Sequence, residues 1–125
     1  MTIENAIRAY IIAQLPGATV VRTSADPSVA LPFVLLTTND DEETRTTGVT
    51  LSSKQLELTV DCWAATPTAA AALADQIKSV FRDYVGSFGG YQIMFSRFFN
   101  SFDSRDGEAA QFARSFTLLL TYQEV

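Results

Sequence analysis

Apolar residues recur along this chain with two different periods, and each period predicts a different kind of element. The first segment carries them at helical spacing, at Ile3, Ala6, Ile7, Tyr10 and Ile11. Thr2 is a suitable N-cap, and Pro16 with Gly17 ends the pattern, so we expect a helix between these points. Thr19 to Arg22 then predicts a short strand, and Thr23 to Pro32 a loop.

The clearest strand lies at Gln55 to Trp63, where apolar and polar residues alternate. One face carries Leu56, Leu58, Val60 and Cys62, and the other carries Gln55, Glu57, Thr59 and Asp61. This period of two is typical of a half-buried strand. Upstream of it, Phe33 to Thr37 predicts a compact apolar strand.

A second helix is predicted over 67–85. Thr66 and Pro67 suit its N-cap and first position, and one stripe of it is apolar, at Leu73, Ile77, Val80, Phe81 and Tyr84. Gly86 to Gly90 is interpreted as the end of this helix and a turn. It lacks the lysine of a phosphate-binding loop and precedes a strand rather than a helix.

The last part of the chain predicts two strands joined by a hairpin. Tyr91 to Asn100 is apolar on both faces, Phe102 to Ala110 is polar, and Phe112 to Tyr122 alternates again. The expected order is therefore α-β-β-β-α-β-β, in one domain over 1–125. We expect an α+β fold in which a mixed or antiparallel sheet packs against two helices.

One polar segment, at about 39–54, has few apolar residues. It contains four consecutive acidic residues, Asp40, Asp41, Glu42 and Glu43, followed by a Thr-rich stretch around Gly48. Two interpretations remain open: a mobile loop, or the tip of a long hairpin. Consecutive acids in a loop are more often solvated than bound to a metal, because calcium loops need alternating ligands and a sharp glycine turn.

Composition limits the classes of function. The chain of 125 residues has 47% hydrophobic and only 18% charged residues, which suggests that a partner covers part of its surface. A net charge of −5 argues against binding to nucleic acid through a basic footprint. The lone Cys62 suits a reducing compartment. Neither a signal peptide at the amino terminus nor an apolar run long enough to span a membrane is visible, so we expect synthesis in the cytoplasm.

The chain shows little capacity for catalysis. Without any histidine, it lacks the commonest general base and metal ligand. One cysteine cannot form a zinc site, and Cys62 on the apolar face of its strand is interpreted as a buried thiol rather than a nucleophile. We therefore predict no catalytic residue, no metal and no cofactor.

Large aromatic residues raise the question of an interface. Trp63 could cover a helix of its own subunit, which we favour, or it could anchor a contact with a neighbour, where tryptophan is enriched. Strand alternation cannot place Phe95, Phe98, Phe99 and Phe102 on one face. The candidates for a subunit interface are Trp63, Phe98, Phe99 and Phe102.

Several segments together resemble the tail terminator, or tail completion, proteins of long-tailed phages. They are Leu-Pro-Phe-Val-Leu-Leu, Leu-Glu-Leu-Thr-Val-Asp-Cys-Trp-Ala and Thr-Pro-Thr-Ala-Ala-Ala-Ala-Leu-Ala-Asp, after an N-terminal helix. In that family a strand with Asp and Trp leads directly into a helix. The matching positions here are Leu58, Val60, Asp61, Cys62 and Trp63, followed by a helix from Ala69 to Val85.

This resemblance implies a structural virion protein without catalytic residues. Six copies would form a ring that caps the tail tube, stops its growth and joins the tail to the head connector. The implied partners are further copies of the chain, the tail tube protein and the connector or stopper protein, with DNA passing through the lumen without specific binding. We expect the acidic segment Asp40 to Glu43 to face the lumen or the tube.

Other functions remain open from the sequence alone. A head-tail connector or stopper and a tail tube protein share small α+β subunits and ring symmetry. A ferredoxin-like domain that binds a small molecule or acts as an enzyme would need a pocket with converging polar groups. An adaptor of a secretion or toxin system is a further alternative.

Overall fold

The computed structural model describes residues 2–16, 19–22, 31–45, 52–82, 84–106 and 111–124, without the side chains at positions 22, 40–45, 52, 53 and 106. The fold is α+β, as predicted. Its elements are α1 (Ile3–Gln14), β1 (Val20–Arg22), β2 (Phe33–Arg45), β3 (Ser52–Ala64), α2 (Pro67–Phe81), β4 (Gly86–Phe88), β5 (Tyr91–Asp106) and β6 (Gln111–Glu124).

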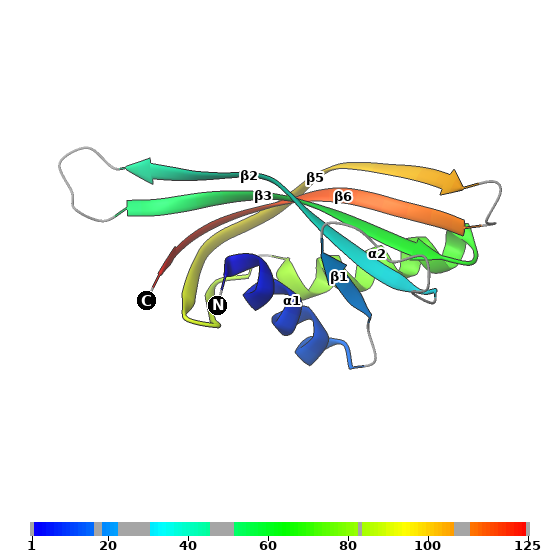
Figure 1. Ribbon diagram of the computed structural model, residues 1–125, viewed down its shortest axis with the longest axis horizontal. Coiled ribbons are helices and arrows are strands. Elements are labelled where there is room, and N and C mark those ends of the chain that lie inside the picture. The colour runs from blue at the N-terminus through cyan, green and yellow to red at the C-terminus, as the bar shows by residue number, and fades with distance from the viewer. Residues whose placement is uncertain are drawn as a thin grey trace.

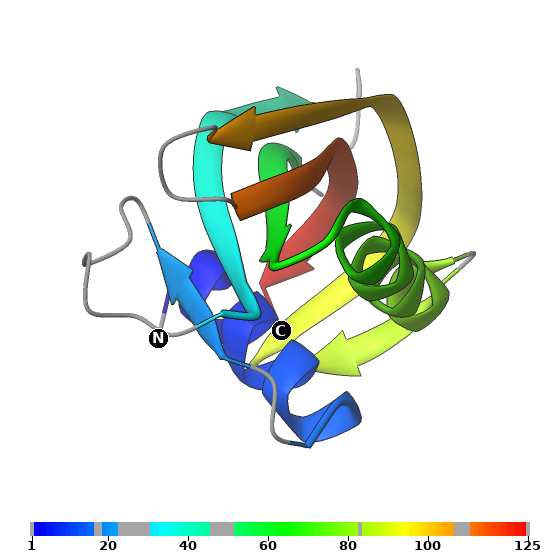
Figure 2. The ribbon, with the colours of Figure 1, turned by 90° about the vertical axis from the view of Figure 1, so that its right-hand side faces the viewer.

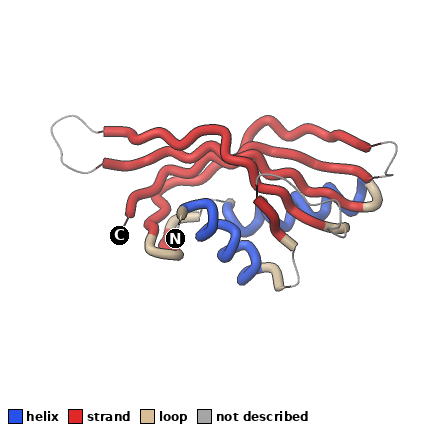
Figure 3. The backbone as a smooth tube through the Cα atoms, in the orientation of Figure 1, coloured by secondary structure: helices blue, strands red, loops and turns tan. Residues whose placement is uncertain are grey.

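The six strands form one mixed sheet in the order β1-β2-β3-β6-β5-β4. β1 pairs with β2 in parallel, and every other neighbouring pair is antiparallel. Figure 1 shows a long twisted sheet with both helices on one side of it, and Figure 3 shows the same two layers in simplified form. In the end-on view of Figure 2, both helices lie on the concave side of the curling strands.

Capping residues begin both helices where the sequence predicts. The Thr2 hydroxyl accepts a hydrogen bond from the Asn5 amide at 3.2 Å, and the Thr66 hydroxyl accepts one from the Ala69 amide at 3.1 Å. Each cap satisfies an amide that has no partner within the first helical turn. Pro67 fits the start of α2 because its fixed φ suits the first helical position.

The second helix ends at Phe81, so the prediction that it reaches residue 85 is wrong. Arg82 leaves helical geometry with a ψ of 119°. The Tyr84 amide then donates to the Phe81 carbonyl at 3.1 Å and to the Ser96 hydroxyl at 3.2 Å. Tyr84 is therefore not on the helical stripe; its ring packs with Tyr10 of α1 and Phe88 of β4.

The core lies between the helices and one face of the sheet. Its fully buried members come from both helices and from the four long strands, and include Ile7, Ile11, Ile77, Phe81, Leu36, Leu56, Leu58, Val60, Ile93, Phe116, Leu118 and Leu120. These residues follow the helical and alternating patterns of the sequence. Arg8 ties α1 to β1, because its Nε donates to the Val20 carbonyl at 2.7 Å.

The glycine-rich turn contains an additional strand. Gly86–Phe88 forms β4 and pairs with the start of β5, and the chain reverses at Gly89 and Gly90, whose φ angles are 58° and 84°. Positive φ favours glycine, which explains the glycine pair at the turn itself. The interpretation of the whole of Gly86 to Gly90 as a helix end and turn is therefore wrong for the first three residues.

The polar segment Phe102 to Ala110 was predicted as a loop, but β5 continues to Asp106 and stays paired with β6. The alternation is hidden because the register shifts between Phe99 and Phe102, where Asn100 has a φ of 57°. Such a bulge inserts an unpaired residue and changes which residues share a face. Residues 107–110 lie outside the described part.

The acidic segment Asp40 to Glu43 lies in a paired strand. β2 continues to Arg45 and pairs with β3 from Ser52 onward, so the strand is much longer than the predicted Phe33 to Thr37. Figure 1 shows this end of the hairpin extending past the helices. Residues 46–51 at its end lie outside the described part.

Candidate assembly surface

The face of the sheet that points away from both helices is called the outer face here. Residues in register share a face, and five rows across β2, β3, β6 and β5 define it. It carries Phe33, Leu35 and Thr37 of β2; Gln55, Glu57, Thr59, Asp61 and Trp63 of β3; Ala113, Ser115, Thr117 and Leu119 of β6; and Phe95, Arg97, Phe99 and Phe102 of β5. No described helix or strand covers this face.

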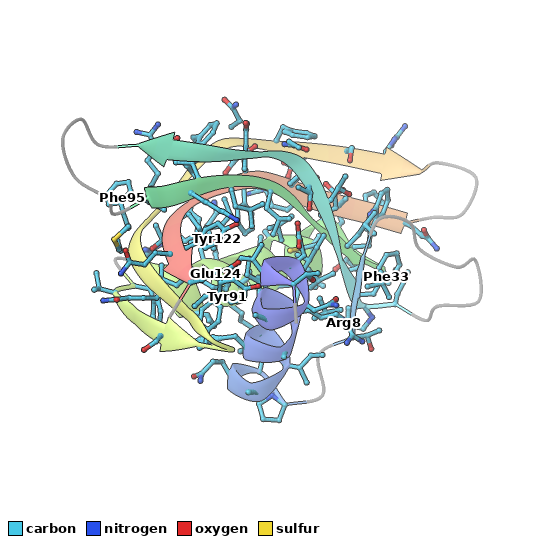
Figure 4. The ribbon with its side chains drawn as sticks, turned by 60° about the vertical axis from the view of Figure 1, so that its left-hand side comes forward. Arg8, Phe33, Tyr91, Phe95, Tyr122 and Glu124 are labelled. Atoms are coloured by element: carbon cyan, nitrogen blue, oxygen red, sulfur yellow. The ribbon has the colours of Figure 1, made fainter. Side chains whose placement is uncertain are left out.

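Aromatic residues make the outer face unusual for a solvated surface. Phe33 and Trp63 stack against each other, with ring centroids 6.4 Å apart. Phe102 and Phe95 are 54% and 52% exposed, which is high for side chains of this size. Figure 4 shows Phe95 and Phe33 at opposite margins of the molecule. Exposed aromatic groups of this kind mark surfaces that bind other proteins.

Polar residues in the middle of the outer face satisfy one another. The Ser115 hydroxyl donates to the Asp61 carboxylate at 2.5 Å, and the Asn39 side-chain amide donates to the Thr59 hydroxyl at 2.7 Å. Ser115 is almost completely buried. The face is therefore preorganised, with small groups in the centre and aromatic rings at the sides.

The structure separates the aromatic candidates. Trp63, Phe99 and Phe102 lie on the outer face, whereas Phe98 lies on the helix side, where its ring meets Phe116 edge to face at 5.5 Å. Trp63 packs within its own chain, stacked against Phe33. Asp40 to Glu43 lie in β2 opposite Glu57 to Lys54, and their side chains are outside the described part.

The arrangement has counterparts among known proteins. The fold is similar to that of a chain in a solved structure described as "Virion of native gene transfer agent (GTA) particle", with a TM-score of 0.63 and 11% identity, over 96% of this chain and 93% of that one. The model of the family "Tail completion protein gp17" matches residues 5–123. The chain belongs to this tail completion family. No curated protein matches its sequence.

Membership of the tail completion family confirms the predicted resemblance and makes the chain a structural component of a virion tail. The matched range includes most of α1, nearly all of β6 and every element between them. The described residues of this family member contain no group of three or more acidic or cysteine side chains arranged to hold a metal ion. Neither of its two described helices is long and apolar enough to cross a bilayer.

Cys62 of this tail completion protein is buried in the core. Burial, together with the neighbouring Asp61 carboxylate, raises the pKa of its thiol to about 12. The thiol therefore remains protonated at neutral pH, and a protonated thiol is a poor nucleophile. The prediction of a buried thiol on the apolar strand face is confirmed.

A surface pocket of about 350 Å³ lies where β5 and β6 approach the start of α2. Its lining includes Pro67, Arg105 and Phe112. Asp103 in its lining accepts hydrogen bonds from Nε and Nη2 of Arg114, so this carboxylate is paired with a positive charge.

Sequence reasoning missed several residues of the outer face. Phe33 and Leu35 were assigned to an apolar strand without a face, and Phe95 and Arg97 were not separated from their neighbours. The register shifts between Ile93 and Phe95 and between Phe99 and Phe102 prevented this.

Proposed function

We propose that this chain forms a ring, of six copies by analogy with the resemblance noted above, that caps the tail tube of a virion, ends its growth and joins the tail to the head connector. The match of the tail completion family to residues 5–123 carries this proposal. The partners are further copies of the chain, the tail tube protein and the connector or stopper protein.

The surface of the subunit supports a role in assembly. Its charged content of 18% is low, and the outer face exposes Phe95 and Phe102 on one strand. Burying such side chains against a partner contributes roughly 1.5–3 kcal/mol for each one that becomes fully covered. Trp63, Phe99 and Phe102 are the residues that we assign to contacts with neighbouring subunits or with the tube.

The net charge of −5 suits a passage for DNA. A channel wall that carries net negative charge repels the phosphate backbone and limits non-specific binding during DNA passage. We assign the acidic segment Asp40 to Glu43 to the lumen or to the tube-facing end of the ring. A structure of the assembled ring with these residues on its outer rim would contradict that assignment.

The solution mass of the purified chain, measured by light scattering together with negative-stain imaging, tests the proposal. We expect closed rings of one size, with a mass near six times the 13.7 kDa of the chain. Open-ended tubes that lengthen with concentration would contradict a terminator and indicate a tube protein. A chain that remains monomeric when mixed with tail tubes of the same virus would contradict both.

Replacing Phe102 with serine is expected to weaken binding to tail tubes assembled from the tube protein of the same virus. The side chain is half exposed on the outer face, so its loss costs little folding energy but removes an aromatic contact. Aromatic anchors of interfaces typically contribute about 2 kcal/mol or more, which predicts a fall in affinity of at least roughly tenfold. Co-sedimentation with the tubes measures this affinity.

Val85 provides the matched control for this experiment. It is 71% exposed but precedes β4, away from the outer face. Val85→Ser should leave co-sedimentation unchanged, and both variants should unfold at the denaturant concentration of the original protein. Equal losses of binding in the two variants would mean that the outer face is not the binding surface.

A further inference from the structure

Two long stretches of strand backbone lie open at opposite margins of the sheet. The terminal strands are short: β1 is in register only with Val34 to Leu36 of β2, and β4 only with Tyr91 to Ile93 of β5. Among the described residues, no strand pairs with the outer side of β2 over 37–45 or of β5 over 95–106. These stretches are called the open β2 edge and the open β5 edge.

Figure 1 shows the ends of β2 and β5 pointing in opposite directions, β2 past the helices and β5 over the start of α2. An exposed strand edge presents unpaired amide and carbonyl groups and is a template for pairing with another chain. Two open edges on one subunit can therefore be joined to two neighbours at once.

The two open edges carry opposite charge. The open β2 edge contains Asp40 to Glu43 in its sequence, against the single Arg45. The open β5 edge carries the exposed Arg97 and Arg105 against the single Asp106 in its sequence, while its Asp103 is paired with Arg114 of the same chain. An acidic edge and a basic edge complement each other across a contact, whereas each edge repels its own copy.

We propose that the open β2 edge of one copy pairs with the open β5 edge of the next, so that the sheets of neighbouring copies join into one continuous sheet around the ring. The inference rests on the proposed ring and specifies the contact that builds it. Such a contact joins two different surfaces, which is the kind of interface that closes rings with more than two members.

Strand direction is consistent with this pairing. Each neighbouring pair from β2 through β3 and β6 to β5 is antiparallel, so β5 runs antiparallel to β2 within one subunit. Rotation about an axis along the strands leaves their directions unchanged. The β2 strand of the next copy therefore meets β5 in antiparallel orientation and continues the pattern of the sheet.

The offset between the two edges also fits a closed ring. Thr37, where the open β2 edge begins, lies in the same row as Phe99, near the middle of β5. To align the centre of the open β2 edge of one copy with the centre of the open β5 edge of the next, the second copy must shift along the strands by about four residues, or roughly 13 Å. The four long strands of one copy are about 19 Å wide. This corresponds to a strand tilt of roughly 35°, within the range that closed sheets adopt.

Charged edges have another use, because charges and bulges also protect strand edges from aggregation. Both edges contain register shifts, between Thr38 and Asp40 in β2 and between Phe99 and Phe102 in β5. Charges of the same sign on both edges, however, would protect the edges from aggregation equally well. Opposite signs on the two edges instead favour attraction between them.

Charge reversal on each edge tests the pairing. The basic-edge variant combines Arg97→Glu with Arg105→Glu, and the acidic-edge variant combines Asp40→Lys, Asp41→Lys, Glu42→Lys and Glu43→Lys. Each variant alone then has two edges of the same sign. We expect each to be monomeric in light scattering, a roughly sixfold fall in mass for a hexameric ring, and a 1:1 mixture to restore the ring with alternating variants.

The controls separate this inference from the proposed function. Arg82→Glu reverses an exposed charge at the end of α2 and should leave the ring intact. If the unchanged chain forms rings but the basic-edge variant also forms them, the edge pairing is wrong and the proposed function stands. A mixture that fails to reassemble also overturns the pairing, provided that circular dichroism shows both variants folded. An unchanged chain without rings, even on tail tubes, overturns both proposals.

Discussion

Replacing Phe116 with alanine is expected to lower the free energy of unfolding by about 3–5 kcal/mol, which is the range for phenylalanine removed from a packed core. Phe116 is fully buried in the central strand β6, in register with Val60 of β3. Its ring meets Phe98 edge to face at 5.5 Å, and the Lys78 ammonium lies 5.1 Å from its centroid. The cavity would remove contacts from two strands and a helix at once.

Urea denaturation of the two proteins measures this loss. The matched control is Phe95→Ala in the neighbouring strand, where 52% of the side chain is exposed. Because less apolar surface is buried there, we expect a loss below about 1 kcal/mol. Similar losses in the two variants would contradict the assignment of Phe116 to the core and Phe95 to the outer face.

Replacing Ser96 with valine is expected to destabilise the fold by about 1–3 kcal/mol, which is the cost of leaving buried polar groups without partners. The Ser96 hydroxyl donates to the Phe81 carbonyl at 2.6 Å and accepts a hydrogen bond from the Tyr84 amide at 3.2 Å. It thus joins β5 to the end of α2. Valine offers neither bond, and its second methyl group must also be accommodated in the packed site.

Ser101 in the same strand is the control for Ser96. It is exposed, and its hydroxyl accepts a hydrogen bond from the Lys78 ammonium at 2.9 Å. Solvent can replace this bond, so Ser101→Ala should change stability by no more than about 0.5 kcal/mol. Thermal unfolding followed by circular dichroism compares the two, and a larger loss for Ser101→Ala would contradict the role of Ser96 as the link to α2.

The elements that were predictable from sequence are those whose periodicity is uninterrupted. β3 alternates without a break from Leu56 to Cys62, and both helices have a threonine cap with an apolar stripe behind it. Local rules therefore determined the fold class, the two helix starts and the burial of Cys62. The short strand β4 escaped prediction, because three residues cannot establish a period.

The rest depended on information that a local pattern does not contain. At the bulges of β5, the side chains that would continue one face of the sheet pass to the other face. The sequence around Asn100 therefore lacks the regular alternation of apolar and polar residues that predicts a strand. The polar residues beyond Thr37 form a strand because β3 provides hydrogen-bonding partners for them, not because of their own composition. Tertiary pairing of this kind overrides local preference.

The same limit applies to the candidate surface. Trp63 was recognised as a candidate, but its partner Phe33 could be found only from the register of β2 with β3. The open edges were also invisible in the sequence, because they result from the shortness of β1 and β4 relative to the strands that they join. Only the composition of the acidic segment was available beforehand.

The position of β6 in the centre of the sheet has a consequence for how the chain folds. β6 follows every other element in the chain, yet it lies between β3 and β5 and joins the two halves of the sheet. The pairing of Val60 with Phe116 closes a long loop, which makes this step slow relative to the formation of the two hairpins. During synthesis, β3 would lack the neighbour on its β6 side until β6 has been made. Cooperative folding would therefore begin only after β6 is synthesised.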